Sequence, residues 1–190
     1  NQAIATYVTQ WTYDSHNRLL EMIYPDEEKI TYSYNLGGQL EKVHGYKSYG
    51  YDYVSKIGYD KFEQRTYLKY CNGAETFYTY DPQRRRLQNL MVNSGGNTIM
   101  DNAYTYDAVS NVLSVINGAS VPQSGKAGGQ MAHTNTYGID TGKKFQLANV
   151  KDVNYRTEET PSESENVNNS HAYEYDANGN LVYVNTSRTK

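Results

Sequence analysis

The stretch Trp11-Thr12-Tyr13-Asp14-Ser15-His16-Asn17-Arg18-Leu19 decides the fold, because its pattern returns along most of the chain. The pattern is an aromatic pair separated by one residue, then Asp or Asn, then an aliphatic residue after a short gap. Clear copies begin at Tyr32, Tyr78, Tyr104 and Tyr173, and a weaker copy contains Tyr59-Asp60. The second aromatic residues of the first five copies stand roughly 20 to 25 residues apart, a period typical of repeat architectures.

Each copy is interpreted as a β-hairpin. Aromatic-x-aromatic is the period-2 signature of a strand, and the Asp or Asn that follows begins a turn. If residues 14–16 form a type I turn, Asn17 must adopt the left-handed conformation that completes a G1 bulge. Gly38 and Gly179 stand at the same offset, which supports this turn. Other copies have less suitable residues there, and we expect longer turns at Glu63, Arg84 and Ser110.

This turn places Asp14 opposite Arg18 and Tyr13 opposite Leu19, and one such aromatic–aliphatic pair contributes about 0.2–1 kcal/mol. An isolated hairpin is marginal in water, so we expect each hairpin to pair with the next. The predicted fold is all-β: antiparallel hairpin repeats that form a twisted, curved and continuous sheet. We assign a structural role in the repeat to Tyr13, Asp14, Leu19, Tyr34, Leu40, Tyr59, Asp60, Tyr80, Asp81, Leu87, Tyr106, Asp107, Tyr175, Asp176, Gly179 and Leu181.

Composition favours a thin sheet over a thick globular core. The 190 residues include 21 Tyr but 3 Phe and 1 Trp, and tyrosine rings can pack while their hydroxyls reach water or a backbone partner.

Leu40 and Val43 are three residues apart, so they fall on opposite faces of a strand unless a bulge intervenes. Apolar side chains on both faces would require both faces to be covered, by neighbouring turns of a coiled sheet, a second layer or an enclosed cargo.

The regularity changes along the chain, which we treat as one segment, residues 1–190, excised from a longer protein. Regular repeats occupy residues 11–116, a looser and loop-rich part follows at 117–172, and a final repeat spans 173–186. Within the looser part, 117–135 is rich in Gly, Ser and Gln and 157–170 is acidic, so both indicate mobile loops. One short turn of helix is expected at 144–149.

Several classes of function lack support in the sequence. A formal net charge of -3 and a pI near 5.8 argue against nucleic-acid binding, and Arg84-Arg85-Arg86 is interpreted as a solvated turn. One cysteine, Cys71, permits no internal disulfide, and neither a membrane span nor a signal peptide is recognisable. The four histidines lie far apart, and no catalytic motif occurs. We therefore expect no enzyme, no catalytic residue, no cofactor and no metal site.

Tyr-Asp-x-x-Gly-x-Leu at such intervals resembles the YD repeat of the rearrangement hotspot (Rhs) family. The best copy is Tyr175-Asp176-Ala177-Asn178-Gly179-Asn180-Leu181, and Asn72-Gly73 before Tyr78-Thr79-Tyr80-Asp81 is similar to a variant of the repeat. The resemblance implies a bacterial secreted or surface-associated, cell-wall-associated polypeptide whose repeats wind into a β-shell around a C-terminal toxin domain. Tc toxin components and animal teneurins share that architecture. The self-cleaving aspartate site of such shells has no match here, so no catalytic residue is carried over.

Two functions remain open at this point. The first is a non-enzymatic module of a polymorphic-toxin shell, whose partners are the rest of its parent polypeptide and the enclosed C-terminal domain. The alternative is a surface module that binds cell-wall or host glycans, with tyrosine rings between Tyr46 and Tyr53 stacking on sugar faces. Unpaired edge strands would also favour edge-to-edge self-association.

Overall fold

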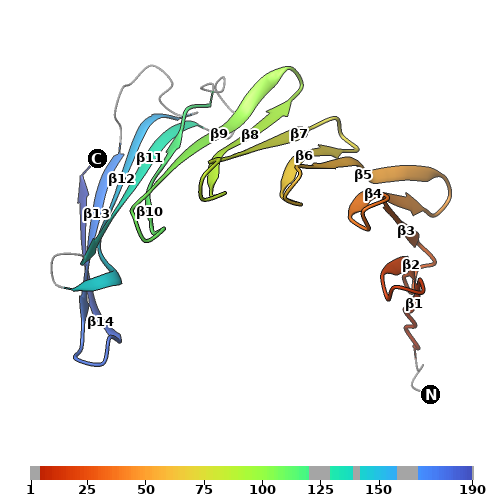
Figure 1. The fold of residues 1–190 in the computed structure, drawn as a ribbon, viewed down its shortest axis with the longest axis horizontal. Helices are drawn as coiled ribbons and strands as arrows, with labels where there is room; N and C mark the ends of the chain where they lie inside the picture. Colours follow the sequence, from red (N-terminus) through yellow and green to blue (C-terminus); the bar gives the residue numbers. More distant parts are fainter. Residues whose placement is uncertain (1–4, 120–128, 139–141, 158–166, 190) are drawn as a thin grey trace. The chain divides into compact units, whose positions relative to one another are not determined.

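The computed structural model describes residues 5–119, 129–138, 142–157 and 167–189 of the chain, and these residues form strands and turns without a helix. The strands are β1 (Gln10–Tyr13), β2 (Leu19–Ile23), β3 (Lys29–Tyr34), β4 (Leu40–Tyr46), β5 (Gly50–Tyr59), β6 (Arg65–Tyr70), β7 (Glu75–Tyr80), β8 (Leu87–Ser94), β9 (Asn97–Tyr106), β10 (Val112–Asn117), β11 (Gly129–Gly138), β12 (Lys143–Thr157), β13 (Val167–Tyr175) and β14 (Leu181–Thr189). They form one antiparallel 14-stranded sheet in which the spatial order is the sequence order (Figure 1). The predicted all-β antiparallel hairpin fold is confirmed.

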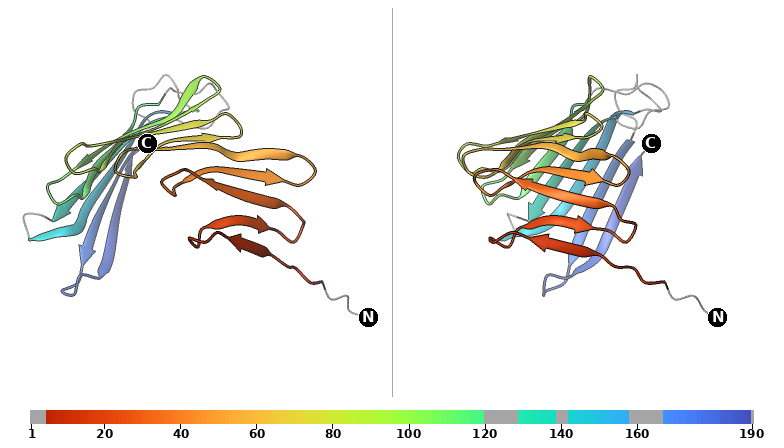
Figure 2. Two further views of the ribbon diagram at one scale, coloured as in Figure 1. Left: turned by 45° about the vertical axis from the view of Figure 1, so that its right-hand side comes forward. Right: turned by 90° about the vertical axis from the view of Figure 1, so that its right-hand side faces the viewer.

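The chain divides into two compact units, Asn1–Phe77 and Tyr78–Lys190, which are described separately. In the first unit, successive hairpins lie side by side as ribbons of one layer, from β1 onward (Figure 2). In the second unit, β8 to β14 are longer on average and also lie side by side in one layer (Figures 1 and 2). Each unit is therefore a sheet without a second layer among its described residues.

The first unit has one aromatic and one polar face. Residues paired directly across antiparallel strands share a face of the sheet. One row crosses five strands as Trp11, Met22, Ile30, Gly45 and Tyr51. The adjacent row, on the opposite face, is Thr12, Glu21, Thr31, His44 and Asp52. We call the side of the first row the aromatic face; it also carries Tyr32, Tyr34 and Val43.

Bulges explain why Leu40 and Val43 do not make the sheet apolar on both faces. Leu40 pairs with Tyr34 and Val43 pairs with Tyr32, with a register shift between Ser33 and Tyr34. Because Tyr32 and Tyr34 are two residues apart, both aliphatic residues lie on the aromatic face. A bulge thus intervenes, the exception stated for this pair, and these two residues do not place apolar side chains on both faces.

Burial is shallow, as a single layer requires. The buried apolar side chains of the described residues are small or medium-sized: Ile30, Ile57, Leu68, Ala74, Ala119 and Val150. No large described side chain is fully buried, and many aromatic rings stay partly exposed. The core is thus a stripe along the sheet, closed by neighbouring strands and not by a second sheet.

The looser part of the sequence is more regular than expected. The expected helical turn at 144–149 is wrong: these residues lie in β12, where Asn149 pairs with Thr136 of β11 and Ala172 of β13. Pairing with β11 along this stretch, joined by pairing with β13 from Asn149 onward, outweighs the local helical preference. Of the two expected mobile loops, 129–135 and 167–170 are strands, whereas 120–128 and 158–166 lie outside the described residues.

Candidate functional site

The aspartate turn that follows the aromatic residues in most repeats is a small hydrogen-bonded unit. Oδ1 of Asp14 accepts the amide hydrogens of His16 at 2.8 Å and Arg18 at 2.9 Å, which fixes the turn from both sides. Oδ2 accepts Nε–H of Arg18 at 2.6 Å. Asn17 has φ 60°, the left-handed conformation expected for the bulge. Tyr13 pairs with Leu19, as predicted.

The same turn recurs at Asp60, Asp107 and Asp176. Each carboxylate accepts the amides two and four residues later, at 2.8 and 3.0 Å for Asp60, 2.9 and 2.8 Å for Asp107, and 2.9 and 2.8 Å for Asp176. The left-handed position holds Glu63 at φ 66°, Ser110 at φ 72° and Gly179 at φ 85°. The expectation of longer turns at Glu63 and Ser110 is therefore wrong, because the carboxylate bonds hold a non-glycine residue in this conformation.

The turn at Asp81 is longer than the other aspartate turns, as expected for the repeat that contains Arg84. Asp81 N–H bonds the carbonyl of Arg86, and Arg85 rather than Arg84 takes the left-handed conformation, with φ 57°. Arg86 Nε lies 2.9 Å from Asp81 Oδ2. This hydrogen bond from Arg86, with further amide bonds, lowers the pKa of the Asp81 carboxyl to about 2. The basic run is thus not simply solvated, since Arg86 is an ion-pair partner.

In three repeats, a tyrosine hydroxyl joins the hairpin to the one before it. Tyr34 donates to the Leu19 carbonyl at 2.7 Å, and Tyr59 donates to the Leu40 carbonyl at 2.6 Å. In the second unit, Tyr106 donates to the Leu87 carbonyl at 2.6 Å. In all three cases the donor is the tyrosine directly before the Asp or Asn of a repeat, and the acceptor is the leucine of the preceding repeat. Sequence reasoning assigned both residues to the repeat but missed this bond between repeats.

Two repeats add an arginine to this junction. The Arg18 guanidinium, paired with Asp14, lies 4.9 Å from the ring centroid of Tyr34. The Arg86 guanidinium, paired with Asp81, lies 4.7 Å from the ring centroid of Tyr106. We call this carboxylate–arginine–tyrosine arrangement the arginine clamp. An arginine directly before the leucine of the repeat is the sequence signal that could have revealed it.

The other predicted repeat residues lie where the pattern placed them. Tyr175 pairs with Leu181 at the last turn, which is closed through Asp176 and Gly179. Tyr80 is the last residue of β7. Tyr13 and Leu181 are about half exposed, at 56% and 51%.

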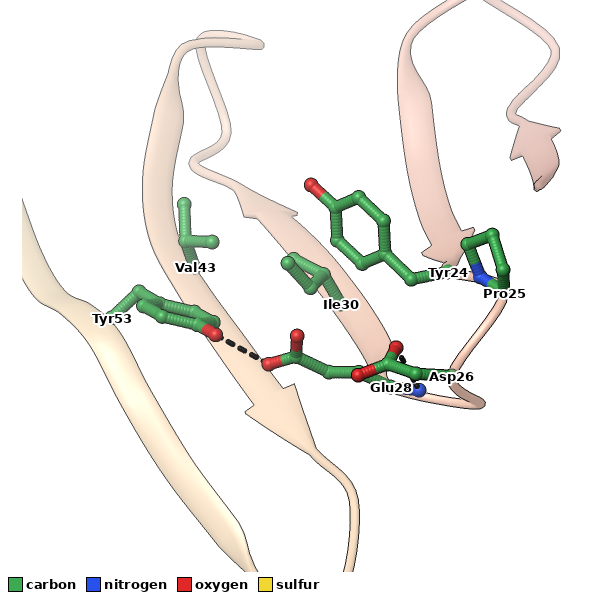
Figure 3. Close-up of a pocket in the computed structure, with 7 residues that line it drawn as sticks. All are labelled: Tyr24, Pro25, Asp26, Glu28, Ile30, Val43 and Tyr53. Atoms are coloured by element: carbon green, nitrogen blue, oxygen red, sulfur yellow. Dashed lines mark hydrogen bonds between the residues drawn. The ribbon is translucent and has the colours of Figure 1, made fainter. Parts of the chain in front are cut away.

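A separate open pocket of about 560 Å³ lies on the first unit, at the Pro25 turn. Its lining residues are Tyr24, Pro25, Asp26, Glu28, Ile30, Val43 and Tyr53 (Figure 3). Tyr24 and Tyr53 stand on either side of Ile30, and the two carboxylates lie at one end. Tyr53 and Tyr51 both donate hydrogen bonds to Oε1 of Glu28. Lys47 Nζ pairs with Asp26 Oδ2 at 2.7 Å.

Other chemistry on the described residues is sparse. On the polar face, Asp52 Oδ1 lies 2.7 Å from His44 Nδ1 and 3.0 Å from Lys42 Nζ. The parts of the chain that the structure describes contain no group of three or more His, Cys, Asp or Glu residues placed to hold a metal ion. Nor do those parts contain a helix suited to crossing a membrane.

Successive tyrosine-led hairpins, closed by turns at Asp or Asn and joined by hydroxyl bonds, define a sheet built of hairpin repeats. No protein-family model matches the chain. The toxin subunit YenC1 of Yersinia entomophaga is 28% identical in an alignment 145 residues long, which covers 69% of this chain and 15% of that protein.

Solved structures match nearly the whole chain. The crystal structure of TcdB2-TccC3-Cdc42 has a TM-score of 0.80 and 23% identity, over 98% of this chain and 9% of that one. The Photorhabdus luminescens Tc holotoxin pore, with the mutation TccC3-D651A, has a TM-score of 0.79 and 21% identity, over 96% of this chain and 9% of that one. The chain thus spans a small fraction of these relatives. The resemblance to the Rhs/YD-repeat family is confirmed, and the chain has the fold of the corresponding part of these structures.

Proposed function

We propose that this chain is a non-enzymatic wall segment of a secreted Tc-like toxin component, in which YD repeats enclose or present a C-terminal toxin domain. The observation that carries the proposal is the bond between repeats, from the tyrosine before the turn of one repeat to the leucine carbonyl of the preceding repeat. Such bonds stabilise contacts between neighbouring hairpins without a second layer. A chain can therefore extend repeat by repeat into a thin wall.

The similarity to YenC1 and to the TcdB2-TccC3 structures supports the same role. In this proposal the partners are the remainder of the parent polypeptide and its C-terminal domain. The polypeptide acts outside the cell that makes it, and the segment contributes a wall and no reaction. The carboxylates of the turns are engaged with backbone amides and neighbouring side chains, which leaves them to hold the turns.

Limited proteolysis of the full parent polypeptide tests the proposal. We expect its C-terminal domain to resist thermolysin while it is part of the parent, and to be cleaved rapidly when it is expressed alone. Electron microscopy of the same sample should show a hollow particle. Equal cleavage rates for the enclosed and isolated domain would contradict enclosure.

The glycan alternative has less support in the structure. Tyr51 and Tyr53 direct their hydroxyls to Glu28, and their rings pack edge to face at 5.3 Å between centroids. Of the tyrosines between Tyr46 and Tyr53, Tyr49 is exposed at 72% and Tyr46 at 52%, and Tyr49 packs edge-on against Tyr51. The rings of Tyr49, Tyr51 and Tyr53 therefore do not form a flat platform for a sugar ring.

A further inference from the structure

We infer that the open pocket at Tyr24, Glu28 and Tyr53 binds the guanidinium group of an arginine side chain presented by another polypeptide segment. The pocket combines two tyrosine rings, an apolar floor and carboxylates at one end (Figure 3). This inference does not depend on the proposed wall function, because it concerns a site within the first unit.

The chain itself shows how such a set of groups is used. In each arginine clamp, a carboxylate and a tyrosine ring hold one guanidinium between them, with the ring centroid 4.9 Å from Arg18 and 4.7 Å from Arg86. The pocket offers the same two kinds of group, Glu28 with Tyr24 and Tyr53, but no described cation lies on either ring. Guanidinium groups stack on aromatic rings and bond carboxylates at the same time, which suits both surfaces.

The carboxylate of Glu28 is held ready for a cation. The hydroxyls of Tyr51 and Tyr53 donate to the same oxygen, Oε1, which fixes the side chain. No described group donates to Oε2, which Figure 3 shows directed away from Tyr53 and towards Ile30. These hydrogen bonds, that of Tyr51 first, lower the pKa of the Glu28 carboxyl, so that it stays ionised at neutral pH.

The charges around the pocket favour a cation over an anion. Asp26 and Glu28 line it, and Glu27 lies between them in sequence. The facing base is Lys47, which is outside the lining and is paired with Asp26. Three carboxylates thus stand near one lysine, and Glu28 has no ion-pair partner among the described residues beside the tyrosine rings. The floor at Ile30, which is 7% exposed, accommodates the methylene stem of a long side chain.

The test uses the 190-residue chain labelled with ¹⁵N and the probe Nα-acetyl-arginine amide. We expect the amide signals of Glu28, Ile30 and Tyr53 to shift in a saturable way with the probe. Nα-acetyl-citrulline amide has nearly the same shape without the charge. It should bind at least about tenfold more weakly, because it cannot make the charge-assisted bond.

Two variants locate the binding. Glu28→Gln keeps an oxygen acceptor for Tyr51 and Tyr53 but removes the charge, and should weaken binding of the arginine probe at least about tenfold. Glu41→Gln makes the same charge change at an exposed residue of β4 and should leave binding of the arginine probe unchanged. If Glu28→Gln fails to fold, Tyr24→Leu removes one ring without touching the Glu28 bonds and should weaken binding as well.

Three results would overturn the inference. The first is no shift at these amides with the arginine probe at concentrations on the order of tens of millimolar. The second is equal binding of the arginine and citrulline probes. The third is binding of N-acetylglucosamine at the same amides in preference to the arginine probe, which would favour a sugar site.

Discussion

Removing one tyrosine hydroxyl between two hairpins measures how much the repeat depends on that bond. Tyr34→Phe deletes the 2.7 Å bond to the Leu19 carbonyl and keeps the ring on which Arg18 lies. Packing and the ring contact are therefore retained. A buried hydrogen bond contributes about 0.5–1.5 kcal/mol, and this one is partly buried, so we expect a loss of about 1 kcal/mol.

The assay is urea unfolding of the 190-residue chain, followed by circular dichroism. With a slope of about 1–3 kcal/mol per molar urea, the midpoint should fall by about 0.3–1 M. Hydrogen exchange provides a local reading: amides of β2 and β3 should exchange faster, whereas those of the second unit should not change.

Tyr32→Phe is the matched control. Tyr32 lies on the same strand and the same face as Tyr34, but its hydroxyl bonds no described group. The loss for Tyr32→Phe should be close to zero. If both variants lose the same stability, or if neither does, the hydroxyl does not join the hairpins and the account of the repeat is refuted.

Three further changes test the turns and the aromatic face. Gly45→Ala should destabilise the chain by roughly 1–3 kcal/mol in urea unfolding, because a Cβ there would lie 2.6 Å from the Tyr51 ring. Glu63→Gly should raise stability by up to about 1 kcal/mol in the same assay, because it relieves a side chain held at φ 66°. The Asp81 carboxyl has its pKa lowered from 3.8 to about 2 by Arg86, so its stabilising effect is complete above about pH 4 and is lost as pH falls towards 2. As pH falls from about 4 to 2, the unfolding temperature of Asp81→Asn should therefore fall less than that of the unmodified chain.

Each change has its own control. Gly118→Ala should cost little, since the nearest atom to its Cβ would be 3.8 Å away. Gly73→Ala places a side chain at φ 82° in open space. It should therefore lower the free energy of unfolding by about as much as Glu63→Gly raises it. An unchanged pH profile for Asp81→Asn would show that Arg86 does not stabilise the ionised carboxylate. A neutral Gly45→Ala would show that the Tyr51 ring moves aside at no cost.

The sequence predicts the hairpins because each signal for them is local. Tyr13, Asp14 and Leu19 carry strand, turn and pairing within nine residues, and the structure places them accordingly. The signal of the Asn72-Gly73 turn is likewise local. The turn closes a three-residue loop in which Gly73 has φ 82°. Signals of this range are readable without knowing which strand lies next to which.

Turn length and the bonds between repeats were harder to predict. Single-residue propensity disfavours a left-handed Glu63 or Ser110, but the aspartate bonds outweigh it. The hydroxyl of Tyr34 reaches a residue 15 positions earlier, and that of Tyr59 a residue 19 positions earlier. Such contacts follow only from the register between hairpins, which the bulges set. The strand at 143–157 was missed for the same reason, because its stability comes from partners on both sides.

A tyrosine at the junction performs two tasks that no other single residue type combines. Its ring covers part of the aromatic face, and its hydroxyl satisfies a carbonyl of the preceding hairpin. Phenylalanine would supply only the first, and serine or threonine only the second. A sheet without a second layer cannot bury much apolar area, so it needs directional bonds between repeats to fix their register. Tyr34, Tyr59 and Tyr106 meet this requirement, and at these three junctions the hydroxyl adds to the ring a directional bond that fixes the order of the hairpins.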